Sequence, residues 1–263
     1  MTTNDTTTFI EAIKQQLADA PDGVDTSAIN AAIEALANPE EERAKIWFLL
    51  DRSGSMQHLT EDVIGGFNQF LTDQTTKPGK ARMTAVQFDG DNPFEVIYDA
   101  KRVATISPLT NRTYFARGIT PLYDAVGTLI ERADARIVKR AKGGHPLEDQ
   151  LVIVFTDGRE NASRRFDRTQ VFDLIKQRMD DDWTFVFMGS NQDSYAEGGK
   201  IGLADGNVQD YAATPESVDK AFASMSRATG EFRGKPRMGR IADKERFFGG
   251  LKEAEEALRQ KKN

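Results

Sequence analysis

Three short runs of almost continuous apolar residues stand out along the chain. They span Ile46–Leu50, Leu151–Phe155 and Trp183–Met188. Runs of this length and uniformity are typical of strands that are buried on both faces of a parallel sheet. Stretches with helical periodicity lie among them, at Glu61–Asp73, Leu122–Ala141 and Arg168–Met179. This alternation predicts a doubly wound, Rossmann-like α/β domain with a mostly parallel central sheet and helices on both faces.

One further pair of segments has a different pattern. Met83–Phe88 alternates between apolar and polar residues, and a turn-prone segment, 89–93, separates it from Phe94–Tyr98. Such a pair predicts a hairpin, and therefore one antiparallel strand at an edge of the sheet. Further along, Thr214-Pro215 predicts the start of another helix, because proline is well tolerated in a first helical turn.

Both ends of the chain differ from this central pattern. Thr6–Asp19 is amphipathic, Pro21-Asp22-Gly23 interrupts it, and a second short helix follows, so residues 1–43 are predicted to form an N-terminal helical hairpin. The α/β domain is expected over residues 44–232. Residues 233–263 begin with a basic, glycine-punctuated stretch and continue into a charged helix, which we interpret as a mobile or partner-ordered C-terminal tail.

Composition narrows the class of protein. The 263 residues carry a net charge of −6, so general nucleic-acid binding is not expected. Cysteine is absent, which excludes disulfides, thiolate metal ligands and a cysteine nucleophile. No apolar run is long enough for a bilayer, and Met1–Thr8 lacks the layout of a secretory signal. We therefore expect a cytoplasmic protein without a membrane partner.

Oxygen-bearing side chains gather where the predicted strands end. Asp51 and Asp157 follow the first and second apolar runs, Ser53 and Ser55 share the loop after Asp51, and Thr120 precedes a predicted helix. In a doubly wound sheet, ligands bind outside the carboxyl ends of the strands. A site made only of hydroxyl and carboxylate oxygens suits magnesium (Mg²⁺), with Mn²⁺ or Ca²⁺ as alternatives, rather than zinc.

Each of these residues also has a simpler explanation. Ser53 and Ser55 could cap the following helix, Thr120 could be an N-cap before Pro121, and Asp157-Gly158 could be an ordinary turn. For any one residue alone, the simpler explanation is favoured. Together, in this order and at strand ends, the five favour a metal site.

The same segments resemble a known family. Asp51 to Ser55 matches the D-x-S-x-S signature of von Willebrand factor type A domains, Gly118 to Ala125 looks like the family's threonine loop, and Thr156 to Gly158 looks like its second aspartate turn. The resemblance implies a metal-ion-dependent adhesion site formed by Asp51, Ser53, Ser55, Thr120 and Asp157. It further implies a protein partner whose Asp or Glu carboxylate completes the coordination of the metal. Segments 157–163 and 189–193 are similar to stand-alone bacterial and phage members.

Two residues near this site are candidates for a partner-binding rim. They are Arg52, which could face solvent or a partner, and Asn161, which could instead be part of a polar loop. Neither histidine, His58 or His145, lies beside a plausible nucleophile and acid, so a hydrolytic triad is not expected.

Three functions remain to be weighed. The leading hypothesis is a non-enzymatic, metal-dependent adaptor. One alternative is a Mg²⁺-dependent phosphatase-like enzyme with Asp51 as nucleophile, although Ser53 stands where such enzymes place a general acid. The other is a structural or assembly protein whose metal site is vestigial.

Overall fold

The computed structural model describes residues 12–13, 15, 43–190 and 194–249. The N-terminal hairpin predicted for residues 1–43 therefore falls almost entirely outside the described residues. Among the residues that are described, no helix is long and apolar enough to cross a membrane.

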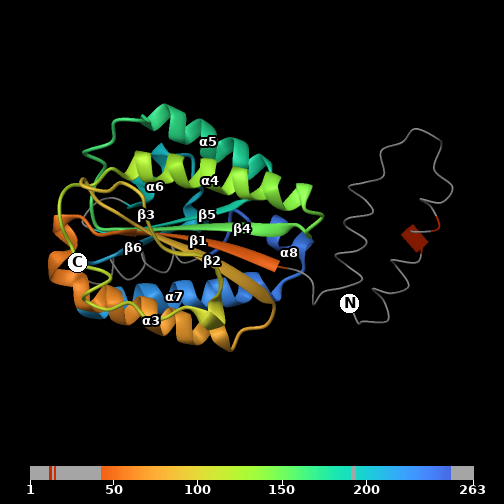
Figure 1. Ribbon diagram of the computed structural model, residues 1–263, viewed down its shortest axis with the longest axis horizontal. Coiled ribbons are helices and arrows are strands. Elements are labelled where there is room, and N and C mark those ends of the chain that lie inside the picture. The colour runs from red at the N-terminus through yellow and green to blue at the C-terminus, as the bar shows by residue number, and fades with distance from the viewer. Residues whose placement is uncertain (1–11, 14, 16–42, 191–193, 250–263) are drawn as a thin grey trace, which may run out of the picture.

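Six strands form one twisted sheet at the centre of the molecule (Figure 1). Their order is β3-β2-β1-β4-β5-β6, and every neighbouring pair is parallel except β2 and β3. The prediction of a mostly parallel sheet with one antiparallel edge strand is thus confirmed. The strands are β1 (Arg43–Asp51), β2 (Lys80–Phe88), β3 (Glu95–Arg102), β4 (Glu148–Thr156), β5 (Thr184–Ser190) and β6 (Val208–Tyr211).

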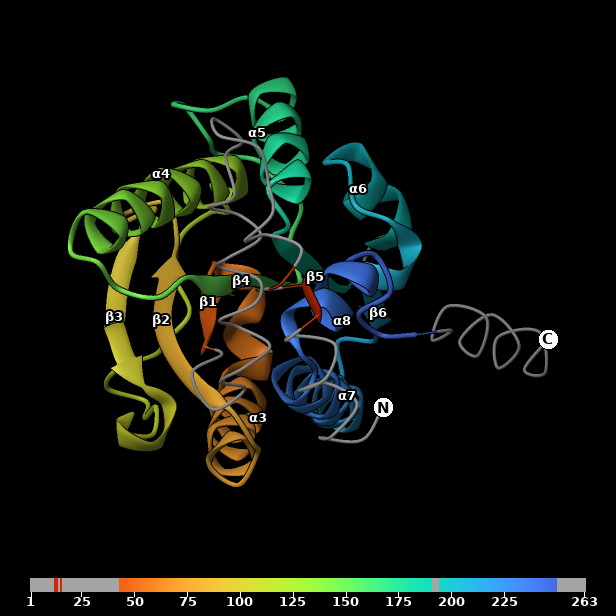
Figure 2. The same ribbon diagram turned by 90° about the vertical axis from the view of Figure 1, so that its right-hand side faces the viewer.

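Helices cover both faces of the sheet, as Figure 2 shows. One face carries α3 (Thr60–Thr75) and α7 (Pro215–Gly234), and the other carries α4 (Leu122–Lys142), α5 (Arg168–Asp180) and α6 (Ser194–Lys200). Shorter elements complete the domain: the 3₁₀ turns η2 (Gly54–Leu59), η3 (Val103–Thr105) and η4 (Asp205–Asn207), and the helix α8 (Arg237–Ala242).

The side-chain alternation of β1 explains its unbroken apolar sequence. Ile46, Phe48 and Leu50 belong to the core beneath α3 and α7, whereas Trp47 and Leu49 belong to the core beneath α4 and α5. Successive side chains of a strand point to opposite faces, so a sheet covered on both sides requires apolar residues at every position. This central strand delivers Asp51 to the carboxyl edge of the sheet.

The described part of the C-terminal stretch, which was predicted to begin at residue 233, packs against the domain. Helix α7 continues to Gly234, and Arg233 and Arg240 are 5% and 3% exposed. Both guanidinium groups donate to main-chain carbonyls, Arg233 to Gly79 at 2.7 Å and Arg240 to Phe232 at 2.8 Å. The tail was predicted from its basic, glycine-punctuated sequence. In the structure, Arg233 and Arg240 donate hydrogen bonds to buried carbonyl groups, so the stretch from Arg233 to Phe248 packs on the domain.

Candidate metal centre

Asp51 ends β1 in a fully buried position at the carboxyl edge of the sheet. Its Oδ1 accepts from the backbone N–H of Ser53 at 2.7 Å, and its Oδ2 accepts from the hydroxyl of Thr156 at 2.5 Å. Burial raises the pKa of Asp51 to about 6, and these two hydrogen bonds only partly offset that effect. The carboxylate is therefore held in a position where its charge lacks full compensation.

Asp157 follows β4, the neighbour of β1, and brings a second carboxylate to the same place. Its Oδ1 accepts from the Ser55 hydroxyl at 2.6 Å, and the Ser53 and Ser55 hydroxyl oxygens lie 3.1 Å apart. Its Oδ2 is buried and, within the described part of the chain, has no hydrogen-bond partner. Burial also raises the pKa of Asp157. An uncompensated buried oxygen of this kind favours a cation as its partner.

Thr120 reaches the site from the loop before α4. A Cβ atom placed on Gly158 would lie 2.8 Å from the Thr120 Oγ1 and 3.4 Å from the Asp51 Oδ2, so this glycine keeps open the space between the two oxygens. The loop is clamped by Asn161, whose Oδ1 accepts from the Thr120 N–H at 2.8 Å and whose N–H donates to the Thr120 carbonyl at 3.1 Å. The structure thus brings all five predicted ligand residues together.

Two acidic residues that sequence analysis missed hold the loops around the site. Asp124, in the first turn of α4, accepts from the backbone N–H groups of 164, 165 and 166 at 2.8–2.9 Å. Glu160 accepts from the N–H of Tyr123 at 2.9 Å and from the hydroxyl of Ser163 at 2.7 Å. The loop after β4 is therefore tied to the start of α4, next to Thr120. The sequence gives no sign of the contacts that Asp124 and Glu160 make between the two loops, because the groups in contact are about 40 residues apart along the chain.

Arg52 does not lie on the rim. Its side chain is 1% exposed and pairs with Asp89, which is itself fully buried, and with Glu95 at 2.5 Å. The prediction that Arg52 faces solvent or a partner protein is wrong. Its guanidinium group is held between two carboxylates and cannot reach a partner protein. Its role is to fix the loop after β2 against the loop after β1. Asn161 is exposed, but its side-chain oxygen is used by Thr120.

Apolar side chains near the Thr120 loop are open to solvent instead. Phe115 is 42% exposed and Ile119 is 52% exposed, although both are large. The guanidinium carbons of Arg52 and Arg117 lie 5.5 and 5.3 Å from the centre of the Phe115 ring, a distance at which cation–π attraction operates. The surface beside the candidate ligands therefore combines apolar area with guanidinium groups that are themselves paired with carboxylates.

Comparison with protein families now identifies the fold. A family model described as the von Willebrand factor type A domain matches residues 45–221, more than half of the chain. The chain belongs to the von Willebrand factor type A family. The matched range begins in β1 and ends in α7, so it includes all five candidate ligand residues of this type A domain. No curated protein matches the chain.

Solved structures are similar in fold at low sequence identity. The pilus adhesin SpaC of Lactobacillus rhamnosus GG, in its open conformation, has a TM-score of 0.53 at 13% identity, covering 72% of this chain and 30% of the adhesin. Proximal thread matrix protein 1 of the mussel byssus has a TM-score of 0.50 at 16% identity, covering 74% of this chain and 48% of that protein. The chain thus spans less than half the length of these proteins, and the likeness concerns the fold.

The residues of this type A domain fit a hard divalent cation. The five candidate ligand residues provide two carboxylates and three hydroxyls, and nowhere in the described residues do three or more His, Asp or Glu side chains gather as a metal cluster. Oxygen donors in this number suit Mg²⁺, which keeps water molecules where the protein supplies too few ligands. The two desolvated carboxylates supply the charge that balances such an ion.

Proposed function

We propose that this type A domain is a non-enzymatic adaptor that binds a partner protein through a divalent cation held by Asp51, Ser53, Ser55, Thr120 and Asp157. The observation that carries the proposal is the buried Oδ2 of Asp157, which has no hydrogen-bond partner among the described residues and lies beside a second desolvated carboxylate. A carboxylate pair of this kind is costly in the absence of a cation.

Mg²⁺ is the proposed ion, with Mn²⁺ or Ca²⁺ as alternatives of the same oxygen preference. When bound, it would supply a Lewis-acidic position for an Asp or Glu carboxylate of the partner. Two protein carboxylates balance a divalent charge without exceeding it, and the hydroxyls of Ser53, Ser55 and Thr120 add donors without adding charge. That balance leaves room for one further anionic ligand.

The surroundings of the site suggest what flanks that carboxylate in the partner. Phe115 and Ile119 offer apolar area, and Arg117 lies beside Phe115 with its side chain 36% exposed and paired with Asp89 and Asp91. Protein interfaces are enriched in aromatic residues and arginine at their energetic centres. We therefore propose a partner segment with an acidic residue beside apolar ones.

A phosphatase-like activity has less support from the site. Ser53 occupies the position where an acid would protonate the leaving group, and its N–H and hydroxyl both point to neighbouring oxygens of the site.

A cytoplasmic location and a non-catalytic role both stay predictions for this chain. The similar SpaC protein is named a pilus adhesin, and an adhesive role is consistent with partner binding.

The test is a titration of the full-length protein with Mg²⁺, followed by calorimetry and thermal unfolding. A ligand that binds only the folded state stabilises it by about 2.7 kcal/mol at a hundredfold excess over its dissociation constant. Wild type is expected to show this stabilisation, whereas Asp51→Ala and Thr120→Ala are expected to lose most of it. Asp173→Ala and Thr72→Ala, at exposed helical positions, are the matched controls.

A partner captured from the source organism's extract in Mg²⁺ and released by chelation would then be tested for dependence on its own acidic residues. Undiminished Mg²⁺ stabilisation of both Asp51→Ala and Thr120→Ala would sink the proposed site. Equal partner binding with Mg²⁺ and with chelator would favour the structural alternative, in which the site is vestigial.

A further inference from the structure

A concave region lies at the end of the sheet opposite the candidate metal centre, where the parallel strands begin. It has a volume of about 400 Å³ and is lined by the first residues of β1 and β2, the end of β3 and the turn after α3. Arg43 and Asp51 are the two ends of β1, so this pocket is about 26 Å from the candidate metal centre. Its cationic lining residues are Arg43, Lys77, Lys80, Arg82, Arg102 and Arg233.

The sheet register forces these cations together. Arg43 is paired with Lys80 across β1 and β2, and Arg82 is directly opposite Arg102 across the antiparallel pair. Like charges directly opposite each other in a sheet are destabilising. In the lining of the pocket, as far as the chain is described, there is no Asp or Glu to offset this. The fold therefore concentrates positive charge here, although the whole chain has a net charge of −6.

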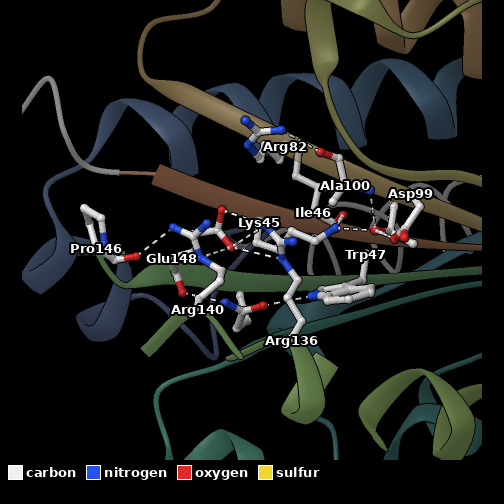
Figure 3. A network of polar contacts seen from close by, with 12 residues as sticks. Lys45, Ile46, Trp47, Arg82, Asp99, Ala100, Arg136, Arg140, Pro146 and Glu148 are labelled. Carbon is white, nitrogen blue, oxygen red and sulfur yellow. Dashed lines mark hydrogen bonds and ion pairs between the residues drawn. The ribbon is translucent and has the colours of Figure 1, made fainter. Parts of the chain in front are cut away.

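Two carboxylates on strands beside the pocket pair with cations outside it. Glu148, which is opposite Arg43 in the register of β1 and β4, accepts from Arg136 at 3.0 Å and pairs with Arg140 at 3.1 Å (Figure 3). Asp99 of β3 pairs with Arg132 at 2.9 Å. The Arg82 guanidinium donates to the carbonyl of Ala100 at 2.8 Å, which is a neutral partner. No ion pair within residues 43–190 and 194–249 involves the pocket's six cationic residues.

Two of the guanidinium groups also have unused buried donors. The Nε atoms of Arg43 and Arg233 are buried and, among the described residues, have no hydrogen-bond partner. Arg233 is 5% exposed, and its other nitrogens donate to Gln74 at 2.6 Å and to Gly79 at 2.7 Å, so its position is fixed. Burial, with repulsion from Arg240, lowers the pKa of Arg233 to about 10. A buried cation that is positioned only by neutral groups favours an anionic partner.

We propose that this pocket binds a compact anion with a diphosphate group, through the side chains of Arg43, Lys80, Arg82 and Arg102. Arginine recognises phosphate through paired N–H donors, and small-ligand pockets have volumes of roughly 300–1,000 Å³, which includes this one. The pocket has no aromatic residue in its described lining on which a base could stack, so the diphosphate is the recognised part.

The chain's own acidic residues are the main competitor for this pocket. Glu40, Glu41 and Glu42 directly precede Arg43 in the sequence. Even if all three faced the pocket, they would supply three negative charges against six positive ones. These three residues alone would therefore leave an excess of positive charge in the pocket.

The experiment is calorimetric titration of the full-length protein with inorganic pyrophosphate and, in parallel, with ADP. The buffer is freed of metal ions by a resin, because pyrophosphate chelates Mg²⁺ and a soluble chelator would itself be a competing polyanion. Wild type is expected to bind one pyrophosphate. Lys80→Gln combined with Arg102→Gln, both exposed positions, is expected to weaken binding about tenfold or more.

The matched control carries the same loss of charge elsewhere. Lys176→Gln combined with Lys220→Gln removes two exposed cations outside the pocket and is expected to change the affinity less than about twofold. Equal affinities of ADP and pyrophosphate would show that the diphosphate alone is recognised.

Three results would overturn the proposal. The first is equal binding by the pocket variant and the control variant. The second is pyrophosphate binding only after Glu40, Glu41 and Glu42 are all changed to Gln, because the pocket would then belong to the chain's own acidic segment. The third is tighter binding of a single-stranded oligonucleotide than of pyrophosphate, which would make the pocket part of a nucleic-acid surface.

Discussion

At the scale of single residues, Asp51 is the most consequential position. It is fully buried, and its pKa rises from 3.8 to about 6 because burial penalises the charged form. A carboxyl whose pKa is higher in the folded than in the unfolded chain stabilises the fold only while it is protonated. In the metal-free protein, this contribution is therefore present at low pH and is lost as the pH rises from about 4 through about 6.

We predict that Asp51→Asn makes the metal-free protein more stable at pH 7.5, by up to about 3 kcal/mol, while it removes the Mg²⁺ response. The Thr156 hydroxyl can turn its proton to the Gly158 carbonyl, 3.1 Å away, and accept from the new amide. Urea unfolding in metal-free buffer at pH 7.5 and pH 5 measures the effect, with Asp173→Asn as control. Lower stability of Asp51→Asn than of wild type at pH 7.5 would contradict the argument.

At the scale of elements, the packing of α3 against α7 depends on Gly66, whereas the adjacent Gly65 faces open space. A Cβ on Gly66 would come within 2.3 Å of the Phe222 ring, whereas a Cβ on Gly65 would have nothing within 4 Å. Phe222 also packs against Phe155 of β4, with ring centres 4.7 Å apart. A change in the contact between the two helices at Gly66 would therefore displace Phe222, which packs directly against β4 of the sheet.

The two glycines should respond to alanine in opposite directions. Gly66→Ala is expected to cost about 1–3 kcal/mol, because the added methyl group overpacks the contact with Phe222. Gly65→Ala is expected to stabilise by about 0.5–1 kcal/mol, because it is exposed within a helix and alanine loses less backbone entropy. The free energies of unfolding of the two variants test this pair, and a change of the same sign in both would refute it.

At the scale of the whole molecule, the domain has two chemically distinct edges joined by a rigid sheet. The carboxyl edge gathers Asp51 and Asp157 with three hydroxyls, and the amino edge gathers six cations around the proposed anion pocket. The segment after α7 closes the amino edge, since Arg240 and Arg237 both pair with Asp149 of β4. The two proposed sites therefore lie at opposite ends of the parallel strands.

Deleting residues 235–263 is predicted to destabilise the domain by at least about 3 kcal/mol, even though the family match ends at residue 221. The deletion removes the buried Arg240 and Phe248 and leaves Asp149 without its two cationic partners. Thermal and urea unfolding measure the loss. Deletion of residues 250–263 is the control, and equal stability of the two truncated proteins would show that 235–249 contributes nothing.

Local patterns in the sequence were sufficient to predict much of the fold and to propose the ligand set. The apolar runs of β1, β4 and β5, the hairpin before β3 and the cap at Thr214 act over short separations, so they can be predicted directly. Because ligands bind outside the carboxyl ends of parallel strands, the sequence also predicts that Asp51 and Asp157 lie close together. The edge strand β6, only four residues long, lacked a pattern strong enough to predict.

Tertiary structure decided what depends on distant partners. From the sequence, Arg52 and Arg233 are expected at the surface, because charged side chains are seldom buried. In the fold, Arg52 is buried against Asp89, and Arg233 donates to the carbonyl groups of Gln74 and Gly79. The clamp of Asn161 on Thr120, and the register that sets Arg82 opposite Arg102, arise in the same way. The sequence by itself determined which chemistry each residue carries, whereas only the folded chain determined which of those groups still need a partner.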